Sequence, residues 1–304
     1  MMTIPAPDFD LEMTLNCGQV FHWRKYRDGF VGTIGDLALY AEQGERALKV
    51  RFGGTPKPAR GTRALPGIVA RYFSLDHPLK EICASFPDDP TMNKARDFCR
   101  GLRIIRQPKW ECLATFICSS MKQVAHIRQI SCALRKRYGG KAMICGITIH
   151  HFPAPELVAT ATENGLRKCA LGYRAKNLLA TAKRVASGEA DLEAWSALSG
   201  DELRARLCEL PGVGTKVANC VMLFAYGRIT AFPIDVWIER VLRQTYFARK
   251  RKVTPRRLAE FTAEYFGPHG GYAQQYLFHH ARSTKNSQRH PQRSRRTLKK
   301  SPER

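Results

Sequence analysis

The chain has 304 residues, 44% of them hydrophobic and 25% charged, and its 50 Lys and Arg against 26 Asp and Glu give a formal charge of +24 at pH 7. This composition excludes a disordered or collagen-like chain and supplies a sizeable core for one large domain or two ordinary ones. The charge favours a polyanionic partner, nucleic acid first, over a surface whose charge serves only solubility.

The sequence carries no signal for secretion or membrane insertion. The longest apolar run, residues 220–226, is far shorter than the roughly 18 residues of a membrane span. The N-terminal sequence MMTIPAPDFDLEM has acids and prolines in place of the basic start and apolar stretch of a secretory signal. We therefore expect an intracellular protein, in a bacterial cytoplasm and nucleoid or in a eukaryotic nucleus.

The ten cysteines include no CxxC pair, and none lies after Cys220. This spacing argues against a zinc ribbon and against a disulfide scaffold. We expect reduced thiols and no bound metal.

Residues 9–53 contain short runs of apolar and β-branched residues separated by turn signals, which predicts an antiparallel sheet. The expected strands cover 20–23, 30–34, 37–41 and 47–52. A Gly- and Pro-rich link follows over 53–61, and helical spacing of apolar residues then predicts an all-helical second part. Its expected helices cover 65–74, 77–86, 91–101, 109–120, 123–138, 154–162, 163–170, 174–187, 200–209, 215–226, 236–246, 255–266 and 270–281.

Together these elements predict an α+β fold in three parts. An N-terminal antiparallel β-sheet domain with flanking helices is expected over 1–105, and a mostly α-helical domain over 106–282, with a helix-hairpin-helix motif at 200–226. A disordered basic tail is expected over 283–304. The tail has a net charge of +7, so 24 − 7 = 17 positive charges remain on the body. A second basic run, 249–252, is expected in a solvated loop.

The most informative stretch for chemistry is the turn Pro-Gly-Val-Gly at 211–214, between two predicted helices. Two glycines beside a proline make a tight turn, which leaves the first N–H groups of the second helix facing outward. With the helix dipole, these donors around Gly212, Val213 and Gly214 form an anion site suited to a DNA phosphate. The residues alone leave an ordinary helical hairpin equally open.

Lys216 is the one charged residue in an otherwise apolar start of the second helix. Its ammonium opposes the dipole at the helix N-terminus and is partly desolvated, which makes it a candidate amine nucleophile. The alternative is a lysine that extends from the first turn into solvent.

Asp235 stands nineteen residues after Lys216, two residues after Pro233, at the start of the next predicted helix. Asp is among the best N-caps, and that role alone would explain it. A carboxylate held by helix N–H groups could also stabilise a cationic sugar transition state.

The order of these features resembles the helix-hairpin-helix superfamily of DNA glycosylases, and the lysine resembles its bifunctional members. The similarity is greatest to the 8-oxoguanine DNA glycosylase/lyase family and covers everything but the tail. The matching stretches are 16–23 (NCGQVFHW), 71–76 (RYFSLD), Glu111-Cys112 with 116–120 (FICSS), 171–176 (LGYRAK), the hairpin, and 271–274 (GYAQ) with Phe278.

The resemblance implies an enzyme that flips 8-oxoguanine out of duplex DNA and excises it. Lys216 would attack the sugar C1′, Asp235 would stabilise the oxocarbenium-like transition state, and a Schiff base would permit β-elimination of the 3′ phosphate. No metal or organic cofactor is implied, and a monomer is expected.

The resemblance also implies the residues that recognise the base. The Gly18 carbonyl would accept the N7–H that 8-oxoguanine has and guanine lacks, Cys220 and Phe278 would sandwich the base, and Gln274 would bind its Watson–Crick edge. Cys220 lies four residues after Lys216, and Phe278 lies four residues after Gln274, so the two members of each pair share a helix face. Without the resemblance, Gly18 reads as a turn glycine and Cys220 and Phe278 read as core.

The chain departs from the family at the residues that contact the opposite strand. Met121 stands where the family has an asparagine that contacts the orphaned cytosine, and His126 replaces an arginine. Arg174, beside Tyr173, matches a family arginine that contacts the same cytosine. These departures predict relaxed opposite-base specificity. In the pocket wall, Trp237 replaces a histidine after the Asp, and Ala281 replaces an acid after the Phe.

Two other interpretations compete with this one. A hairpin glycosylase could act on another oxidised or alkylated base, although an iron–sulfur cluster is not expected because its cysteines would lie after the hairpin domain. A non-catalytic DNA-damage-binding protein could keep the hairpin as a phosphate clamp, but such a clamp needs neither Lys216 nor Asp235.

Overall fold

The computed structural model describes residues 1–53, 64–248 and 253–289. The link at 54–61, the basic run 249–252 and the segment 290–304 lie outside these described residues. The strands are β1 (Met2–Pro5), β2 (Arg24–Tyr26), β3 (Gly29–Ile34), β4 (Leu37–Gln43), β5 (Ala47–Phe52), β6 (Lys141–Ile144) and β7 (Ile147–His150). The α-helices are α1 (Leu11–Asn16), α2 (Leu65–Tyr72), α3 (Leu79–Ala84), α4 (Pro90–Phe98), α5 (Lys109–Ser119), α6 (Val124–Tyr138), α7 (Pro155–Ala159), α8 (Glu163–Leu166), α9 (Arg174–Ala186), α10 (Gly200–Cys208), α11 (Thr215–Phe224), α12 (Val236–Thr245), α13 (Pro255–Phe266) and α14 (Gly270–Arg289).

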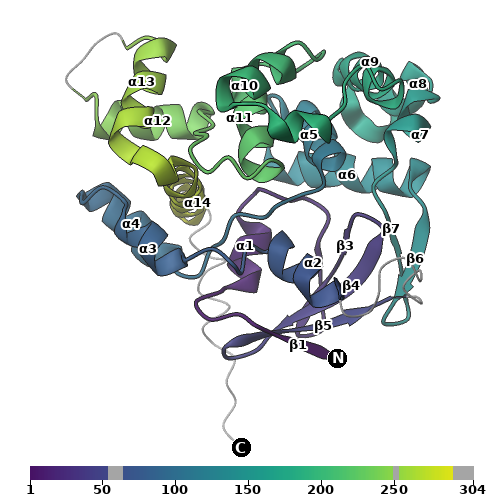
Figure 1. Cartoon of the computed structure of the whole chain (residues 1–304), viewed down its shortest axis with the longest axis horizontal. Coiled ribbons are helices and arrows are strands. Elements are labelled where there is room, and N and C mark those ends of the chain that lie inside the picture. The colour runs from purple at the N-terminus through teal and green to yellow at the C-terminus, as the bar shows by residue number, and fades with distance from the viewer. Residues whose placement is uncertain (54–63, 249–252, 290–304) are drawn as a thin grey trace, which may run out of the picture.

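The N-terminal part is a five-stranded antiparallel sheet in the order β1-β5-β4-β3-β2, with α1 and α2 beside it and most of the other helices above it in Figure 1. The antiparallel sheet followed by a mainly helical part confirms the predicted fold class. The predicted strands at 30–34, 37–41 and 47–52 are confirmed as β3, β4 and β5.

One local prediction in this part is wrong, and two elements were missed. Residues 20–23 form no strand, because they run through the interior with Val20 and Trp23 buried, and pairing begins only at Arg24. The strand β1 was not anticipated. Neither was helix α1, a short helix whose N-cap Asp10 accepts a hydrogen bond from the Met13 N–H at 2.7 Å.

The prediction of an all-helical second part is also wrong, because β6 and β7 form a hairpin within it. The turn between them places Cys145 and Gly146 at positive φ, as a tight hairpin connection requires. Ile144 and Ile149 then pack with Val31 and Tyr40 of the N-terminal sheet. The hairpin therefore extends the helical part onto the face of the sheet that carries Val31 and Tyr40.

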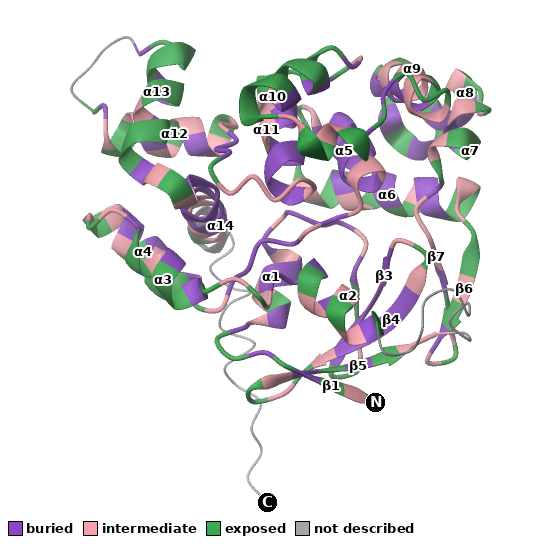
Figure 2. Ribbon diagram, viewed as in Figure 1, coloured by how far each residue is buried: buried purple, intermediate pink, exposed green. Residues whose placement is uncertain are grey.

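Two main apolar clusters hold the fold together. One lies between the sheet and helices α1 and α2, and the larger one fills the helical part. Helices α3 and α4 belong to the larger cluster, where the rings of Phe86 and Tyr276 meet at 5.3 Å. The domain boundary at residue 105 stays a prediction. Figure 2 shows that buried residues concentrate in α5, α11 and α14, at the centre of the molecule.

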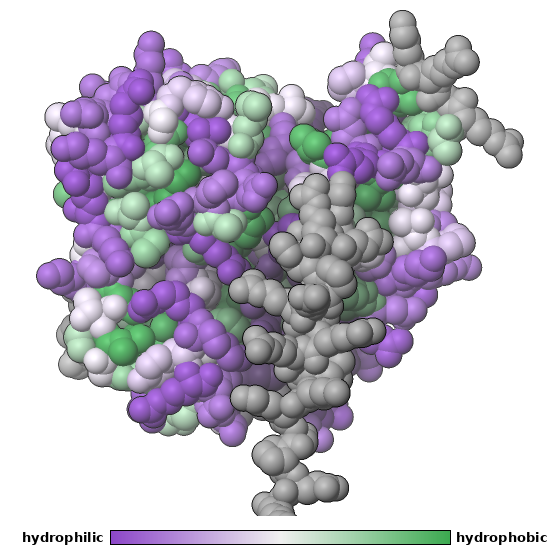
Figure 3. Space-filling model, turned by 180° about the vertical axis from the view of Figure 1, so that it is seen from behind, coloured by the Kyte–Doolittle hydropathy of each residue, from purple (hydrophilic) through white to green (hydrophobic). Residues whose placement is uncertain are grey.

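Helix α14 runs from Gly270 to Arg289, so the start of the predicted disordered tail, 283–289, is helical instead. Its buried first half explains this, because Tyr272 and Tyr276 anchor the helix and it continues outward from there. Seen from behind, the periphery of the molecule is mostly hydrophilic, with apolar side chains exposed in smaller patches (Figure 3). None of the described helices is long and apolar enough to cross a bilayer.

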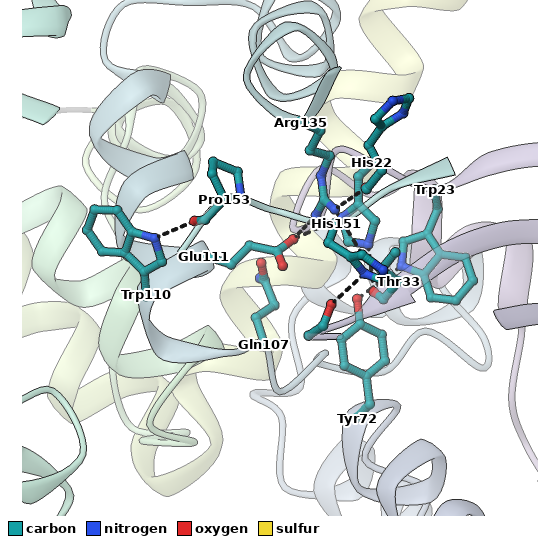
Figure 4. A network of polar contacts seen from close by, with 12 residues as sticks. His22, Trp23, Thr33, Tyr72, Gln107, Trp110, Glu111, Arg135, His151 and Pro153 are labelled. Carbon is teal, nitrogen blue, oxygen red and sulfur yellow. Dashed lines mark hydrogen bonds and ion pairs between the residues drawn. The ribbon is translucent and has the colours of Figure 1, made fainter. Parts of the chain in front are cut away.

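A buried polar network joins the sheet to the helical part (Figure 4). The guanidinium of Arg135 on α6 forms an ion pair with Glu111 on α5 and donates to the Thr33 hydroxyl of β3 at 2.9 Å. His22 lies 3.2 Å from the same carboxylate, and burial and the Arg135 charge hold its pKa well below the usual value. Since the Arg135 and Glu111 side chains are 5% and 7% exposed, each depends on the other for its burial.

Replacing Arg135 with Met should destabilise the fold by about 3–5 kcal/mol, because it leaves the Glu111 carboxylate buried without its cation. The control is Arg243→Met, whose exposed pair with Glu239 should contribute less than about 1 kcal/mol.

The Arg135→Met variant should also change how stability depends on pH. Burial raises the pKa of Glu111 and Arg135 opposes that rise. Without Arg135, the folded state should therefore keep the Glu111 proton at pH values at which the unfolded chain, with the ordinary pKa of 4.5, has released it. The stability deficit, measured by urea unfolding, should therefore be smaller at pH 5 than at pH 8. An equal deficit at both would show that Glu111 is not the source.

Candidate active site

The hairpin between α10 and α11 has the geometry expected of a backbone anion site. Gly212 has φ +82° and packs so closely on Asn177 that an added Cβ would lie 2.8 Å from the Asn177 Cβ. Val213 is buried, whereas Gly212 and Gly214 are exposed. Gly214 is the N-cap of α11, and no side chain caps that helix. The first N–H groups of α11 are thus available to an external acceptor.

Lys216 lies in the first turn of α11 and is half-buried. Its Nζ is 3.5 Å from the Ser119 hydroxyl at the end of α5 and 5.4 Å from the centre of the Phe116 ring. The amine therefore points toward α5 within the molecule. This position argues against the alternative of a lysine that simply extends into solvent.

Asp235 is the N-cap of α12, where one carboxylate oxygen accepts from the Trp237 N–H at 3.0 Å and the Ile238 N–H at 2.9 Å. Burial raises the pKa of Asp235, and the Ile238 N–H and the Lys216 ammonium are the main opposing influences. The residue is thus an N-cap, as its position predicted. It is also a carboxylate close enough to Lys216 for their charges to interact.

Gly18 follows α1 in a loop that is fixed by buried amides. It has φ +96°, and an added Cβ would lie 2.6 Å from the Arg282 Nη1 and 3.2 Å from the Phe278 ring. Next to it, the side chain of Gln19 donates to the Arg103 carbonyl at 2.8 Å and accepts from the Ile105 N–H at 2.8 Å. Both the conformation and the close neighbours require glycine at this position.

The other residues predicted to recognise the base lie on α11 and α14. Cys220 is buried, which raises the pKa of its thiol to about 11, so the thiol is neutral near pH 7. Gln274 is 4% exposed, and its Oε1 has no hydrogen-bond partner among the described residues. Phe278 lies one turn further along α14 and touches Gly18. The contact shows that segments 260 residues apart in the sequence meet here.

The residues predicted to contact the opposite strand lie on the surface around the end of α5. Met121 is 94% exposed and has φ +52°, and His126 is exposed as well. Arg174 is different, because it is buried and donates from Nε to the Ser120 carbonyl at 2.8 Å. The exposed ring of Tyr173 covers its guanidinium at 4.3 Å. Arg174 thereby fixes the turn that presents Met121.

Two neighbours of the site were assigned no role from the sequence. Ser119 was noted only within the resemblance, and Arg282 was not singled out, because a contact with Gly18 across the whole chain leaves no local pattern. No group of three or more His, Cys, Asp or Glu side chains in residues 1–53, 64–248 and 253–289 is placed to hold a metal ion. The expected lack of a metal stays a prediction.

Two family models match consecutive parts of the chain, which together span residues 1–267. Residues 1–113 match the 8-oxoguanine DNA glycosylase N-terminal domain, and residues 114–267 match the HhH-GPD superfamily of base excision DNA repair proteins. Together they cover both the sheet and the hairpin.

Curated relatives and solved structures agree. A probable N-glycosylase/DNA lyase of Methanothermobacter thermautotrophicus is 30% identical over 92% of this chain and 96% of its own length. The Arabidopsis thaliana N-glycosylase/DNA lyase OGG1 is 29% identical over 89% of this chain and 77% of its own. The Clostridium acetobutylicum 8-oxoguanine glycosylase/lyase, solved with double-stranded DNA containing cytosine opposite 8-oxoguanine, superposes with a TM-score of 0.84 at 28% identity over 94% of this chain and 99% of that one.

Proposed function

The chain belongs to the 8-oxoguanine DNA glycosylase family of the HhH-GPD superfamily, and on that premise we propose that it excises 8-oxoguanine from duplex DNA with Lys216 as nucleophile and Asp235 as electrostatic partner. It is a base-excision-repair N-glycosylase with DNA lyase activity. The observation that carries the residue assignment is the meeting of one amine and one carboxylate, mutually within electrostatic range, beside an uncapped helix N-terminus.

The hairpin would bind a phosphate of the damaged strand through the N–H groups that follow Gly214. With the sugar so placed, the Lys216 amine gives its electron pair to C1′, the glycosidic bond breaks, and the base leaves with that bond's electrons and a proton. Positive charge develops on the sugar, and the Asp235 carboxylate stabilises it. The C1′–O4′ bond of the sugar then breaks as the Lys216 nitrogen lone pair forms the C1′=N bond, and O4′ takes up a proton, which leaves an open-chain iminium. Abstraction of a C2′ proton from this iminium breaks the C3′–O bond and expels the 3′ phosphate.

Gln274 supports the choice of a guanine-type base. A buried amide oxygen without a partner costs about 1–3 kcal/mol unless a ligand supplies a donor. The Watson–Crick edge of 8-oxoguanine carries N1–H and N2–H donors that suit this oxygen. Cys220 and Phe278 supply apolar surfaces for the two faces of the base, and the Gly18 carbonyl would accept its N7–H.

Several finer features belong to the same proposal. We propose that reading of the opposite base is relaxed, because Met121 has no polar atom with which to recognise cytosine and Arg174 is committed to the Ser120 carbonyl. The protein would act as a monomer, without an iron–sulfur cluster or other cofactor, in the compartment that holds the DNA.

Replacing Lys216 with Gln should abolish base excision and the borohydride-trapped adduct on duplexes containing 8-oxoguanine, because the amide cannot supply a nucleophilic electron pair. Binding of the same duplex, measured by fluorescence anisotropy, should stay within about threefold, since the hairpin amides remain. A variant that keeps its turnover would exclude the lysine mechanism. An unaltered protein that binds the lesion but never cleaves would favour a DNA clamp.

Replacing Asp235 with Asn separates the capping role from the catalytic one. Asn caps helices as well as Asp does, so the free energy of unfolding should change by less than about 0.5 kcal/mol. Single-turnover excision should nevertheless fall by about 100-fold or more, because the charge opposite the developing cation is gone. If excision stays near the unaltered rate, Asp235 is a cap only.

Excision rates on duplexes with C, A, G or T opposite 8-oxoguanine should lie within about tenfold of one another. A good side-chain pair to a base edge contributes about 1–3 kcal/mol of discrimination, and Met121 forms none. Met121→Asn, which restores an amide at this position, should raise the preference for C. A preference for C above about 100-fold in the unaltered protein would contradict relaxed reading.

A further inference from the structure

Arg282 lies beside Gly18 and Phe278, on the helix face that already carries two predicted base contacts. Gln274, Phe278 and Arg282 follow one another at a spacing of four on α14, so their side chains share one side of the helix. The Arg282 guanidinium lies 5.3 Å from the centre of the Phe278 ring and approaches Gly18 so closely that a Cβ there would be 2.6 Å from Nη1.

The two ends of this guanidinium are in different situations. Nη2 donates to the Asn16 carbonyl at 2.7 Å, which anchors the side chain to the loop before Gly18. Nη1 is buried and has no hydrogen-bond partner among the described residues. None of the ion pairs found in the described part of the chain includes Arg282, and its burial lowers its pKa. A buried, unpaired guanidinium donor is costly, and an acceptor on a ligand would remove that cost.

The hydrogen-bond donors and acceptors at this site can be compared with those on the edges of 8-oxoguanine and guanine. Gln274 offers an acceptor, the Gly18 carbonyl is a second acceptor under the proposed function, and Arg282 Nη1 is a donor that lies next to Gly18. In 8-oxoguanine the N7–H donor is directly next to the C8 carbonyl acceptor, with N1–H and N2–H on the opposite edge. Guanine presents a bare acceptor at N7 and a C–H at C8. Only the oxidised base offers a donor and an acceptor in neighbouring positions on the Gly18 side.

We propose that Arg282 is a specificity-determining residue that donates from Nη1 to the C8 carbonyl of the flipped 8-oxoguanine, while Nη2 stays on the Asn16 carbonyl. This inference rests on the proposed function and deepens it, because the lesion is then read at both atoms that oxidation changes. Ala281 favours the arrangement, since an acid beside Arg282 would compete for the guanidinium.

A second guanidinium provides a matched control. Arg128 on α6 donates to the Asn16 side-chain oxygen at 2.8 Å and also has one buried N–H, on Nε, without a partner among the described residues. It lines a cavity of about 820 Å³ between the sheet and α6, and neither Lys216, Asp235, Gln274 nor Phe278 lines that cavity. Arg128 thus resembles Arg282 in its chemistry and anchor but lines a cavity that none of those four residues lines.

The test compares Arg282→Met with Arg128→Met on three duplexes under single-turnover conditions, carrying 8-oxoguanine, 8-thioguanine or a preformed abasic site. Arg282→Met should slow excision of 8-oxoguanine by about 10- to 100-fold, as expected for loss of a charged hydrogen bond. It should slow excision of 8-thioguanine much less, because sulfur is a poor acceptor although the N7–H remains. Strand cleavage at the abasic site, where no base occupies the pocket, should change by less than about threefold. Arg128→Met should leave the ratio of the 8-oxoguanine and 8-thioguanine rates unchanged.

Equal losses on all three duplexes would show that Arg282 only supports the fold, and no loss on 8-oxoguanine would show that it does not contact the base. Either result overturns the proposal. These outcomes differ from failure of the proposed function, in which the unaltered protein excises no 8-oxoguanine at all and both inferences fall together. Arg282→Lys adds a check, because one ammonium cannot replace both ends of the guanidinium and should restore only part of the rate.

Discussion

The proposed base site depends on the position of one segment, residues 16–19, which comprises the end of α1 and the loop after it. For the Gly18 carbonyl to face a base held beside Gln274 and Phe278, this segment must lie against α14. Buried polar groups hold it there: the Gln275 side chain donates to the Cys17 carbonyl at 3.2 Å, and Arg282 donates to the Asn16 carbonyl at 2.7 Å. Gln19 fixes the other side through the Arg103 carbonyl and the Ile105 N–H. Apolar packing alone would allow the loop to slide, whereas each of these bonds has one geometry.

The same reasoning applies to the way the sheet is placed on the helices. The ion pair of Arg135 with Glu111 joins α6 to α5, and the Thr33 contact extends it to β3. A buried ion pair stabilises a fold no more than apolar residues of equal size would, but it requires its two side chains to meet in one particular geometry. We therefore assign this network an orienting role. Because α5 ends at Ser119, next to Lys216, an error in its placement would also move the partner of the amine.

Local features of the site could be predicted from the sequence, and features assembled across the chain could not. The hairpin, Lys216 and Asp235 lie within 25 residues, where Gly, Pro and N-cap chemistry leave a readable pattern. The β6–β7 hairpin was missed because its strands are four residues long and carry Lys and His, so that the tertiary contact of Ile144 and Ile149 decides the conformation. Gln274 could be placed only through the family resemblance, since a buried glutamine has no periodicity of its own.

The pocket and the opposite-strand surface use polar groups differently, and the difference follows from burial. The Gln274 Oε1 and the Arg282 Nη1 are buried and have no hydrogen-bond partner among the described residues, so leaving either unpaired is costly, and under the proposed function that cost would discriminate between bases. At the surface, Met121 is 94% exposed, and the cation that could read a base, Arg174, is used to fix the Ser120 carbonyl. An exposed methionine can fill the gap left by a flipped base through its shape, whatever base stands opposite. Under the proposed function, selectivity would therefore be concentrated on the lesion, at the buried groups, and not on the opposite base.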